Sequence, residues 1–254
     1  MSYVPLGVRT EFSFLDGMCR VEALVERARS LRLPAVGIAD VHSTYGFVPF
    51  LLAARAAGVR PVLGVTLRLQ PDLPGQDGWG EGPADLVLLP RDLRGYRNLL
   101  HLLSQVHLEN SAAAPAAGFQ DLARFSGGLV ALDGGMHGPV ARALARGLTP
   151  GAERIAAHLR EIFGADGFYM EVQRHGAADE VVVEPFVMRL ARTLNIPLVA
   201  TGDVRYLDAA DAEAYDVLRC IQSGHALDDP ARPRLANDQY FLKSDLQMRH
   251  LYRD

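Results

Sequence analysis

The amino-acid sequence predicts one α/β domain over residues 1–254, with seven strands in a closed or nearly closed barrel. Short runs rich in Val, Ile and Leu alternate along the chain with longer segments of helical period. The runs lack polar alternation, so we expect both faces of each strand to be buried. Strands and helices that alternate at this spacing indicate parallel strands joined by right-handed crossovers, and seven such strands favour a barrel over a small open sheet.

The predicted elements follow these patterns in chain order. The strands are the apolar runs Val4–Val8, Ala35–Ala39, Pro61–Leu67, Leu86–Leu89, Gly128–Leu132, Phe168–Val172 and Pro197–Thr201. The helices are the periodic segments Val21–Leu31, Gly46–Ala57, Tyr96–Leu108, Val140–Arg146, Ala152–Phe163, Glu180–Leu194 and Ala209–Ile221.

Three segments fall outside this pattern. Gln70–Ala84 consists of turn residues, with repeated Gly and Pro, and predicts a surface loop. Glu109–Gly118 is rich in small residues and predicts a second surface loop. Gly224–Asp254 has the weakest pattern and is expected to form a C-terminal extension.

The composition excludes several classes of protein. A net charge of −4 argues against a surface that grips nucleic acid directly. Cys19 and Cys220 form no CxxC pair, which favours a reducing cytoplasm over a secreted disulfide framework. The N-terminus lacks the features of a signal peptide, and no stretch approaches the roughly 18 to 20 apolar residues that span a bilayer. We therefore expect a cytoplasmic protein with no membrane association.

In parallel α/β folds, sites form at the carboxyl ends of strands, so the residues at or next to the ends of the predicted strands are candidates. This set is rich in carboxylates and arginines and poor in histidines: Arg9, Asp40, Val41, His42, Thr66, Asp85, Asp133, Gly135, Glu171, Gln173, Arg174, His175, Asp203 and Arg205. A multinuclear hydrolytic site needs converging imidazoles and carboxylates. HExxH, Walker, GxSxG and GxGxxG motifs are absent from the sequence. The residues alone therefore predict no complete catalytic set.

Several segments, read in order, resemble the PHP domain at the start of bacterial DNA polymerase III alpha subunits. LGVRTEFSFLDG at residues 6–17 is similar to the form LHxHSxYSxLDG, and GIADVHSTYG at residues 37–46 to the form ITDHGNMYG. Further matches are RPVLGVTL at residues 60–67, DLVLLPRDLRGYRNLL at 85–100, GLVALDGGMHGPVARAL at 128–144, EVQRHG at 171–176 and ATGDVRYL at 200–207. The resemblance covers nearly the whole chain.

The resemblance implies a distorted seven-stranded β/α barrel. In metal-competent members of the family, nine ligands hold up to three cations, and some of these domains act as phosphoesterases or proofreading exonucleases. Transferred to this sequence, the nine ligand positions are Gly7, Arg9, Asp40, Val41, Thr66, Asp85, Gly135, Asp203 and Arg205. Asp40 and Asp203 keep the family residue, and Asp85 is a possible third ligand. The site is expected to be vestigial.

Carboxylates that face each other without cations would repel one another and take raised pKa values. Arg9 and Arg205 could supply the missing positive charge, so we expect them to pair with Asp40 and Asp203. No catalytic residue, metal or cofactor is expected. If the domain is active, the resemblance implies Zn, Mn or Mg. A mononuclear site of Asp40, Asp85 and Asp203, or replacement ligands at His42 and His137, remain alternatives.

The resemblance thus implies a catalytically inactive PHP domain of a replicative DNA polymerase III alpha subunit, or a stand-alone relative, with a structural role. The expected partner is a polymerase core, palm and thumb, in the same chain or in a partner chain. Other replisome subunits are further candidates, and contact with DNA would be indirect. Two alternatives stay open: a metal-dependent phosphoesterase or 3′–5′ exonuclease with a rewired site, and a free-standing module that binds a replication protein.

Overall fold

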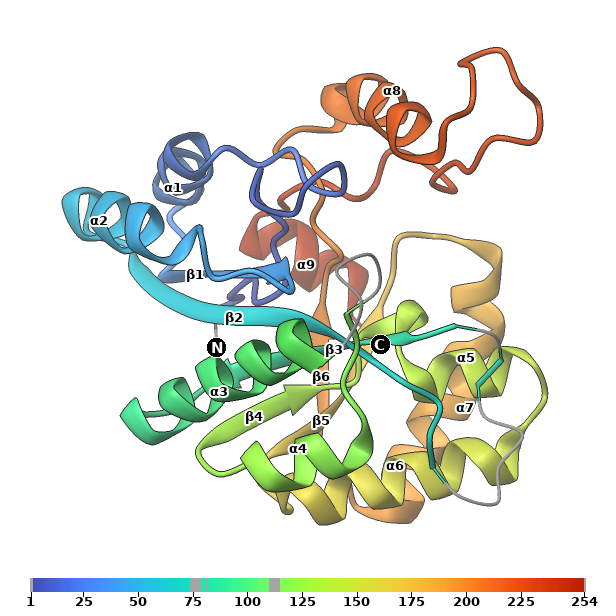
Figure 1. Cartoon of the computed structure of the whole chain (residues 1–254). Helices are drawn as coiled ribbons and strands as arrows, with labels where there is room; N and C mark the ends of the chain where they lie inside the picture. Colours follow the sequence, from blue (N-terminus) through green and yellow to red (C-terminus); the bar gives the residue numbers. More distant parts are fainter. Residues whose placement is uncertain (1, 74–78, 81, 110–114, 254) are drawn as a thin grey trace. The chain divides into compact units, whose positions relative to one another are not determined.

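The computed structural model describes residues 2–73, 79–80, 82–109 and 115–253 (Figure 1). The chain divides into two compact units. The first unit comprises residues 1–64, 174–177 and 201–254, and the second comprises residues 65–173 and 178–200.

The first unit contains the two ends of the chain. Its regular elements are α1 (Val21–Ser30), β1 (Ala35–Val41), α2 (Phe47–Ala57), the start of β2 (Arg60–Leu69), the short 3-10 helix η2 (Ala209–Asp211), α8 (Ala212–Ser223) and α9 (Asp245–Leu251). Helices α1 and α2 pack against each other. Three buried tyrosines, Tyr206, Tyr215 and Tyr240, form a further core cluster beside α8.

The second unit contains most of the strands. Its elements are the rest of β2, β3 (Ala84–Pro90), α3 (Leu93–Glu109), α4 (Phe119–Phe125), β4 (Leu129–Leu132), the 3-10 helix η1 (Gly135–His137), α5 (Pro139–Ala145), α6 (Thr149–Phe163), β5 (Phe168–Gln173), α7 (Ala178–Leu194) and most of β6 (Leu198–Thr201). Helices α5, α6 and α7 pack together, and α3 packs on β3 and β4.

The six strands form one sheet in the order β1-β2-β3-β4-β5-β6. The predicted α/β fold is confirmed, and six of the seven predicted strands are present. The strand predicted at Val4–Val8 is wrong: within it Val8 alone makes bridges, to Ile38 of β1 and to Val204 just after β6. Pro5 has no N–H to donate and Gly7 has no side chain to pack, which explains why this run does not extend into a strand.

The prediction that neighbouring strands run parallel is wrong for two pairs. Strand β3 lies antiparallel to β2, with Thr66 opposite Val87, and antiparallel to β4, with Val87 opposite Leu132. Strands β4 and β5 are parallel. The reversed direction of β3 has a consequence for the site, because it places the first residues of β3 beside the ends of β2 and β4.

The predicted loop regions are described in part. Residues 74–78, 81 and 110–114 of the two predicted loops lie outside the described residues. Trp79 is buried, and its ring meets Phe119 of α4 edge-on with 6.2 Å between centroids. Its Nε1–H donates to the carbonyl of Gly82 at 3.2 Å, so Trp79 acts as a local anchor. Within the described residues, no helix combines the length and apolar character needed to cross a bilayer.

Candidate functional site

The nine positions transferred from the family motifs are divided between the two units. The first unit carries six of them, namely Gly7, Arg9, Asp40, Val41, Asp203 and Arg205, and the second unit carries Thr66, Asp85 and Gly135.

Arg205 is the centre of a buried ion-pair network in the first unit. Its Nη2 lies 2.6 Å from Oδ2 of Asp203, and its Nη1 lies 2.6 Å from Oδ1 of Asp16. All three side chains are largely buried, with 5%, 9% and 12% exposure for Arg205, Asp203 and Asp16. The predicted pairing of Arg205 with Asp203 is confirmed. One guanidinium thus bridges two carboxylates, an arrangement of strong, charge-assisted hydrogen bonds.

Arg9 enters the same network from the other side of Asp16. Its Nη1 donates to Oδ2 of Asp16, and its Nε lies 3.8 Å from Oδ1 of Asp203. Asp16 therefore accepts from both arginines. Asp16 is not among the residues predicted from the sequence, because it follows no predicted strand. It lies in a turn closed by a hydrogen bond of 2.8 Å from its own N–H to the carbonyl of Ser13. The aspartate of the LDG motif was the available signal.

Asp40, at the end of β1, is held by hydroxyl and amide groups of the first motif. Its Oδ1 accepts from the backbone N–H of Thr10 at 2.7 Å and from the hydroxyl of Ser13 at 2.6 Å. Its Oδ2 accepts from the hydroxyl of Thr10 at 2.7 Å. The sequence analysis expected an arginine partner and did not foresee these donors. Thr10 and Ser13 fix the carboxylate of Asp40 within the turn that also carries Asp16.

The charges in this network shift several pKa values. Burial alone would raise the pKa of Asp16, but the charges of Arg205 and Arg9 hold it below its usual value. Burial raises the pKa of Asp40 above its usual value, and the hydrogen bonds from Ser13 and Thr10 oppose this effect. Burial would lower the pKa of Arg205, but Asp203 and Asp16 raise it instead. Arg205 therefore stays a permanent cation in the interior.

The remaining positions in this unit hold no ligand group. Val41 ends β1, and its backbone N–H donates to the hydroxyl of Ser13 at 3.2 Å. A side chain at Gly7 would meet its nearest neighbour, the carbonyl of Gly202, at an ordinary 3.9 Å. The lack of a side chain at Gly7 is therefore not required by packing. His42, an alternative ligand, is buried and has a positive φ of 51°.

In the second unit, Thr66 and Asp85 occupy neighbouring antiparallel strands. Thr66 is buried in β2, and Asp85 is half-buried near the start of β3, opposite Arg68. Because β3 runs antiparallel to β4, Asp85 at the start of β3 lies beside the residues that follow β4. Gly134 approaches the carbonyl of Asp85 so closely there that a Cβ on it would lie 2.1 Å from the carbonyl oxygen. Burial lowers the pKa of Arg142 in α5 below its usual value, and the negative charge of Asp85 opposes this shift.

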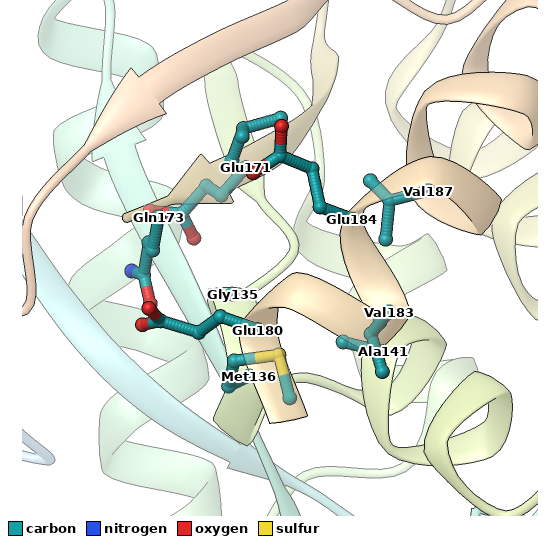
Figure 2. A pocket seen from close by; sticks show the side chains of 10 residues that line it. Gly135, Met136, Ala141, Glu171, Gln173, Glu180, Val183, Glu184 and Val187 are labelled. Carbon is teal, nitrogen blue, oxygen red and sulfur yellow. The ribbon is translucent and has the colours of Figure 1, made fainter. Parts of the chain in front are cut away.

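Gly135 lies where the family motif has a cysteine. It has a positive φ of 54°, and a Cβ on it would collide with the side-chain amide of Gln173. Gln173 ends β5 and lies over this position (Figure 2). The side chain of Gln173 thus fills the space that a side chain at position 135 would need.

A pair of acidic residues stands beside Gly135. Asp133 is buried, and its Oδ1 accepts from the backbone N–H of Glu171 at 2.9 Å. Glu171 in turn accepts from the N–H of Gly134 at 2.6 Å. Burial and the neighbouring Glu171 raise the pKa of Asp133 well above its usual value. Its Oδ2 has no hydrogen-bond partner among the described residues.

Glu171 also lines a small cavity between β5 and α7 (Figure 2). Glu180 and Glu184 of α7 line the cavity too, together with apolar side chains such as Val183 and Val187. Its volume of about 20 Å³ has room for one water molecule. The cavity is too small for an organic substrate.

Arg174 and His175 of the EVQRHG motif brace the first unit. Arg174 donates to the carbonyl of Leu251 at 2.6 Å and stacks over the ring of Tyr252. The ring of His175 stacks on Tyr240 with 4.2 Å between centroids, and its Nε2 accepts from the N–H of Asp203 at 3.3 Å. His175 thus contacts the segment that carries Asp203 and Arg205, whereas Arg174 holds the end of α9.

A divalent cation needs several ligand side chains that converge on one point. Across the part of the chain that the structure describes, no group of three or more His, Cys, Asp or Glu side chains is arranged to hold a metal ion. In the first unit, the carboxylates of Asp16 and Asp203 already accept from guanidinium groups. These side chains do not fit the metal cluster that the resemblance implies.

Curated relatives agree with the motif comparison. DNA polymerase III subunit alpha of Escherichia coli strain K12 is 33% identical over 253 residues, which is 99% of this chain and 21% of the relative. The same subunit is 33% identical in Treponema pallidum, over 99% of this chain and 22% of the relative. The subunit of Pseudomonas aeruginosa is 35% identical, over 100% of this chain and 21% of the relative. The chain spans about a fifth of the length of these relatives.

Solved structures share the fold at low sequence identity. A Bifidobacterium adolescentis protein described as a metal-dependent phosphoesterase matches with a TM-score of 0.53 and 14% identity, over 98% of this chain and 95% of that one. An amidohydrolase from Chromobacterium violaceum, with bound sulfate and no metal, matches with a TM-score of 0.54 and 15% identity. The match covers 80% of this chain and 87% of that one. The sequence profile of the PHP domain matches residues 5–175. The chain therefore belongs to the PHP domain family.

Proposed function

We propose that this chain is a catalytically inactive PHP domain with a structural role in DNA replication, acting together with a DNA polymerase III alpha polymerase core. The similarity to the alpha subunits, which extends over 99% of this chain at 33% identity in Escherichia coli, supports the replication context. A role beside that core implies a cytoplasmic location and indirect contact with DNA.

The observation that carries this proposal is the position of Arg205. Its guanidinium binds Asp203 and Asp16, each at 2.6 Å, where the resemblance implies a histidine that would ligate a cation. A divalent ion next to Asp203 would have to displace this group and would meet its positive charge at close range. The chain therefore carries its own fixed cation in place of a metal, and it lacks the Lewis acid that would activate a water.

Hydrolysis is the direct test of inactivity. Purified protein would be incubated with bis(p-nitrophenyl) phosphate and with 5′-labelled single-stranded DNA, each with added Mn²⁺ or Zn²⁺. We expect no turnover above buffer. Metal-dependent hydrolysis that disappears in both Asp40→Asn and Asp203→Asn would contradict the proposal and favour a rewired phosphoesterase.

A restored variant provides the matched control. Gly7→His, Arg9→His, Val41→His and Arg205→His together return the family's histidines to the first unit, and a Cβ at Gly7 would make only an ordinary contact of 3.9 Å with the carbonyl of Gly202. We expect this variant to bind more Mn²⁺ or Zn²⁺ than the native chain. Because the variant removes Arg9 and Arg205 from their buried ion pairs, its folding would be checked by circular dichroism. In a folded variant, that gain would show that the missing histidines limit metal binding by the native chain.

The structural role is tested by association. We expect the chain to co-purify with a polymerase III alpha core, palm and thumb, taken from the same cell. Failure to associate with the core, combined with capture of a different replication protein, would favour a free-standing binding module.

A further inference from the structure

Four exposed arginines lie on α3 and α4 of the second unit, or directly before α3, and these two helices pack side by side (Figure 1). They are Arg91, Arg94, Arg97 and Arg124. Arg94, Arg97 and the exposed His101 occupy positions i, i+3 and i+7 of α3, so they share one face of that helix. We call the four arginines, together with His101, the arginine surface.

The segment that follows α4 brings it close to the start of α3. A Cβ on Gly127 would lie 2.9 Å from Nη2 of Arg94. The carbonyl of Gly127 accepts from the side-chain amide of Asn98 at 2.6 Å, and the carbonyl of Gly128 accepts from the N–H of Arg91 at 2.9 Å. The guanidinium of Arg94 therefore lies against the end of α4.

An aromatic ring connects the two helices a turn further along α3. The ring of Phe125, the last residue of α4, stacks on that of His101 with 6.2 Å between centroids. The guanidinium carbon of Arg124 lies 5.1 Å from the centre of the same ring. The arginines of α3 and α4 thus belong to one continuous surface.

The arginine surface carries positive charge that the protein does not neutralise. Among the described residues, none of its four arginines forms an ion pair or a side-chain hydrogen bond. The carboxylate of Asp92, within the same stretch, is occupied by the first turn of α3, since its Oδ1 accepts from the N–H of Gly95 at 2.8 Å. Asp121 of α4 accepts from Gln105 at 2.8 Å. Arginines this close repel one another, and a polyanion would relieve that repulsion.

We propose that the arginine surface binds the phosphate backbone of double-stranded DNA without reading its sequence. Guanidinium groups match phosphate oxygens with paired hydrogen bonds. The helix rises about 10 Å from Arg94 to His101, and B-DNA carries one phosphate charge per about 1.7 Å of its axis, so several phosphates would face this surface. The proposal goes beyond the proposed function, which by itself implies only indirect contact with DNA.

The same residues argue against two other polyanions. A single strand is bound largely by stacking its bases on aromatic rings, whereas Phe125 is half-buried and already contacts His101 and Arg124. A protein interface centres on buried apolar anchors. Leu93, at 62% exposure, is the single exposed large apolar side chain among the described residues 91–101 and 124–128. The surface therefore offers charge for a backbone and little for a base or an apolar anchor.

Binding would be measured by fluorescence anisotropy with a labelled duplex of about 20 base pairs, with EDTA present so that no metal bridges the two. At low salt we expect dissociation constants on the order of 10⁻⁶ to 10⁻⁴ M. Four phosphate contacts predict a slope of about −3 to −4 for log K against log salt concentration. A duplex of unrelated sequence should bind equally well. No binding at low salt, a slope near zero, or a tenfold preference for one sequence would overturn the proposal.

A charge-matched pair of variants locates the contact. Arg94→Ala with Arg97→Ala should weaken duplex binding about tenfold or more and bring the salt slope about 2 closer to zero. Arg189→Ala with Arg192→Ala removes the same charge from exposed positions of α7 and should change the affinity less than twofold. Equal weakening by both double variants would show that net charge, and not this surface, governs binding.

Two competing probes test the identity of the polyanion. A single strand of the same length and poly-glutamate should each bind about tenfold more weakly than the duplex. Tighter binding of the single strand would indicate base stacking, and tighter binding of poly-glutamate would indicate an acidic protein partner; either result would overturn the proposal. Hydrolysis with Mn²⁺ or Zn²⁺ would contradict the proposed inactivity alone, because the arginine surface contains none of the nine positions transferred from the family motifs.

Discussion

Nη2 of Arg205 lies 2.6 Å from Oδ2 of Asp203, and both side chains are largely buried. Asp203 and Arg205, two residues of the segment that resembles a PHP motif, thus form a buried ion pair. Asp16 joins the two arginines of the network, since it accepts from Arg205 and from Arg9.

Removing Arg205 should destabilise the fold strongly. Arg205→Met would leave the buried carboxylates of Asp203 and Asp16 without their main partner, and breaking a buried ion pair in this way costs about 3–5 kcal/mol. The free energy of unfolding in urea provides the measurement. Arg29→Met is the control, because its pair with Glu26 is exposed, and it should change stability little. A loss under about 1 kcal/mol for Arg205→Met would show that the network is not an important source of stability.

The network should also set part of the pH dependence of stability. Arg205 and Arg9 hold the pKa of Asp16 below its usual value of 3.8, against the effect of burial. A carboxylate with a lowered folded-state pKa stabilises the fold above its unfolded pKa, and this contribution is lost as pH falls through the folded pKa. The native chain should therefore have a higher free energy of unfolding than Asp16→Asn at neutral pH. This difference should shrink below about pH 4. A difference in the free energy of unfolding that stays constant from pH 7 to pH 2 would contradict this account.

Gly135 should not accept the cysteine of the family motif. Its φ of 54° disfavours any side chain, and a Cβ there would collide with the amide of Gln173. We expect Gly135→Cys to lower the free energy of unfolding by about 1–3 kcal/mol. Adding Gln173→Ala removes the collision and should recover part of this loss, while the strain of positive φ remains. Equal stability of Gly135→Cys and the native chain would contradict the claim that the positive φ and Gln173 exclude a side chain at position 135.

Most of the fold could be predicted from the sequence, and the wrong or missing parts of the prediction have local causes. Strands β1 to β6 were predictable because each is a compact apolar run. Their direction was not, because the alternation of strands and helices does not reveal that β3 runs against both neighbours. Helix α4, at Phe119–Phe125, was missed because seven residues carry too little period. Helix α9 was also missed, although Ser244 and Gln247 form a capping box that signals its start.

The site was predictable in its positions and only partly in its contacts. The motif comparison identified Arg9, Asp203 and Arg205, which lie in one network. It did not identify Asp16, which shares both arginines, or the hydroxyls of Thr10 and Ser13 that hold Asp40. Such contacts depend on how a turn folds back onto a neighbouring strand, which spacing in the sequence does not specify.

Metal binding by the intact chain tests the central claim most directly. Protein prepared without chelator would be titrated with Zn²⁺ and with Mn²⁺ in a calorimeter, and its metal content would be measured by mass spectrometry. The account predicts no bound metal above background and no saturable heat that depends on Asp40 or Asp203. Two or more equivalents of either metal, lost in Asp40→Asn and in Asp203→Asn, would contradict it.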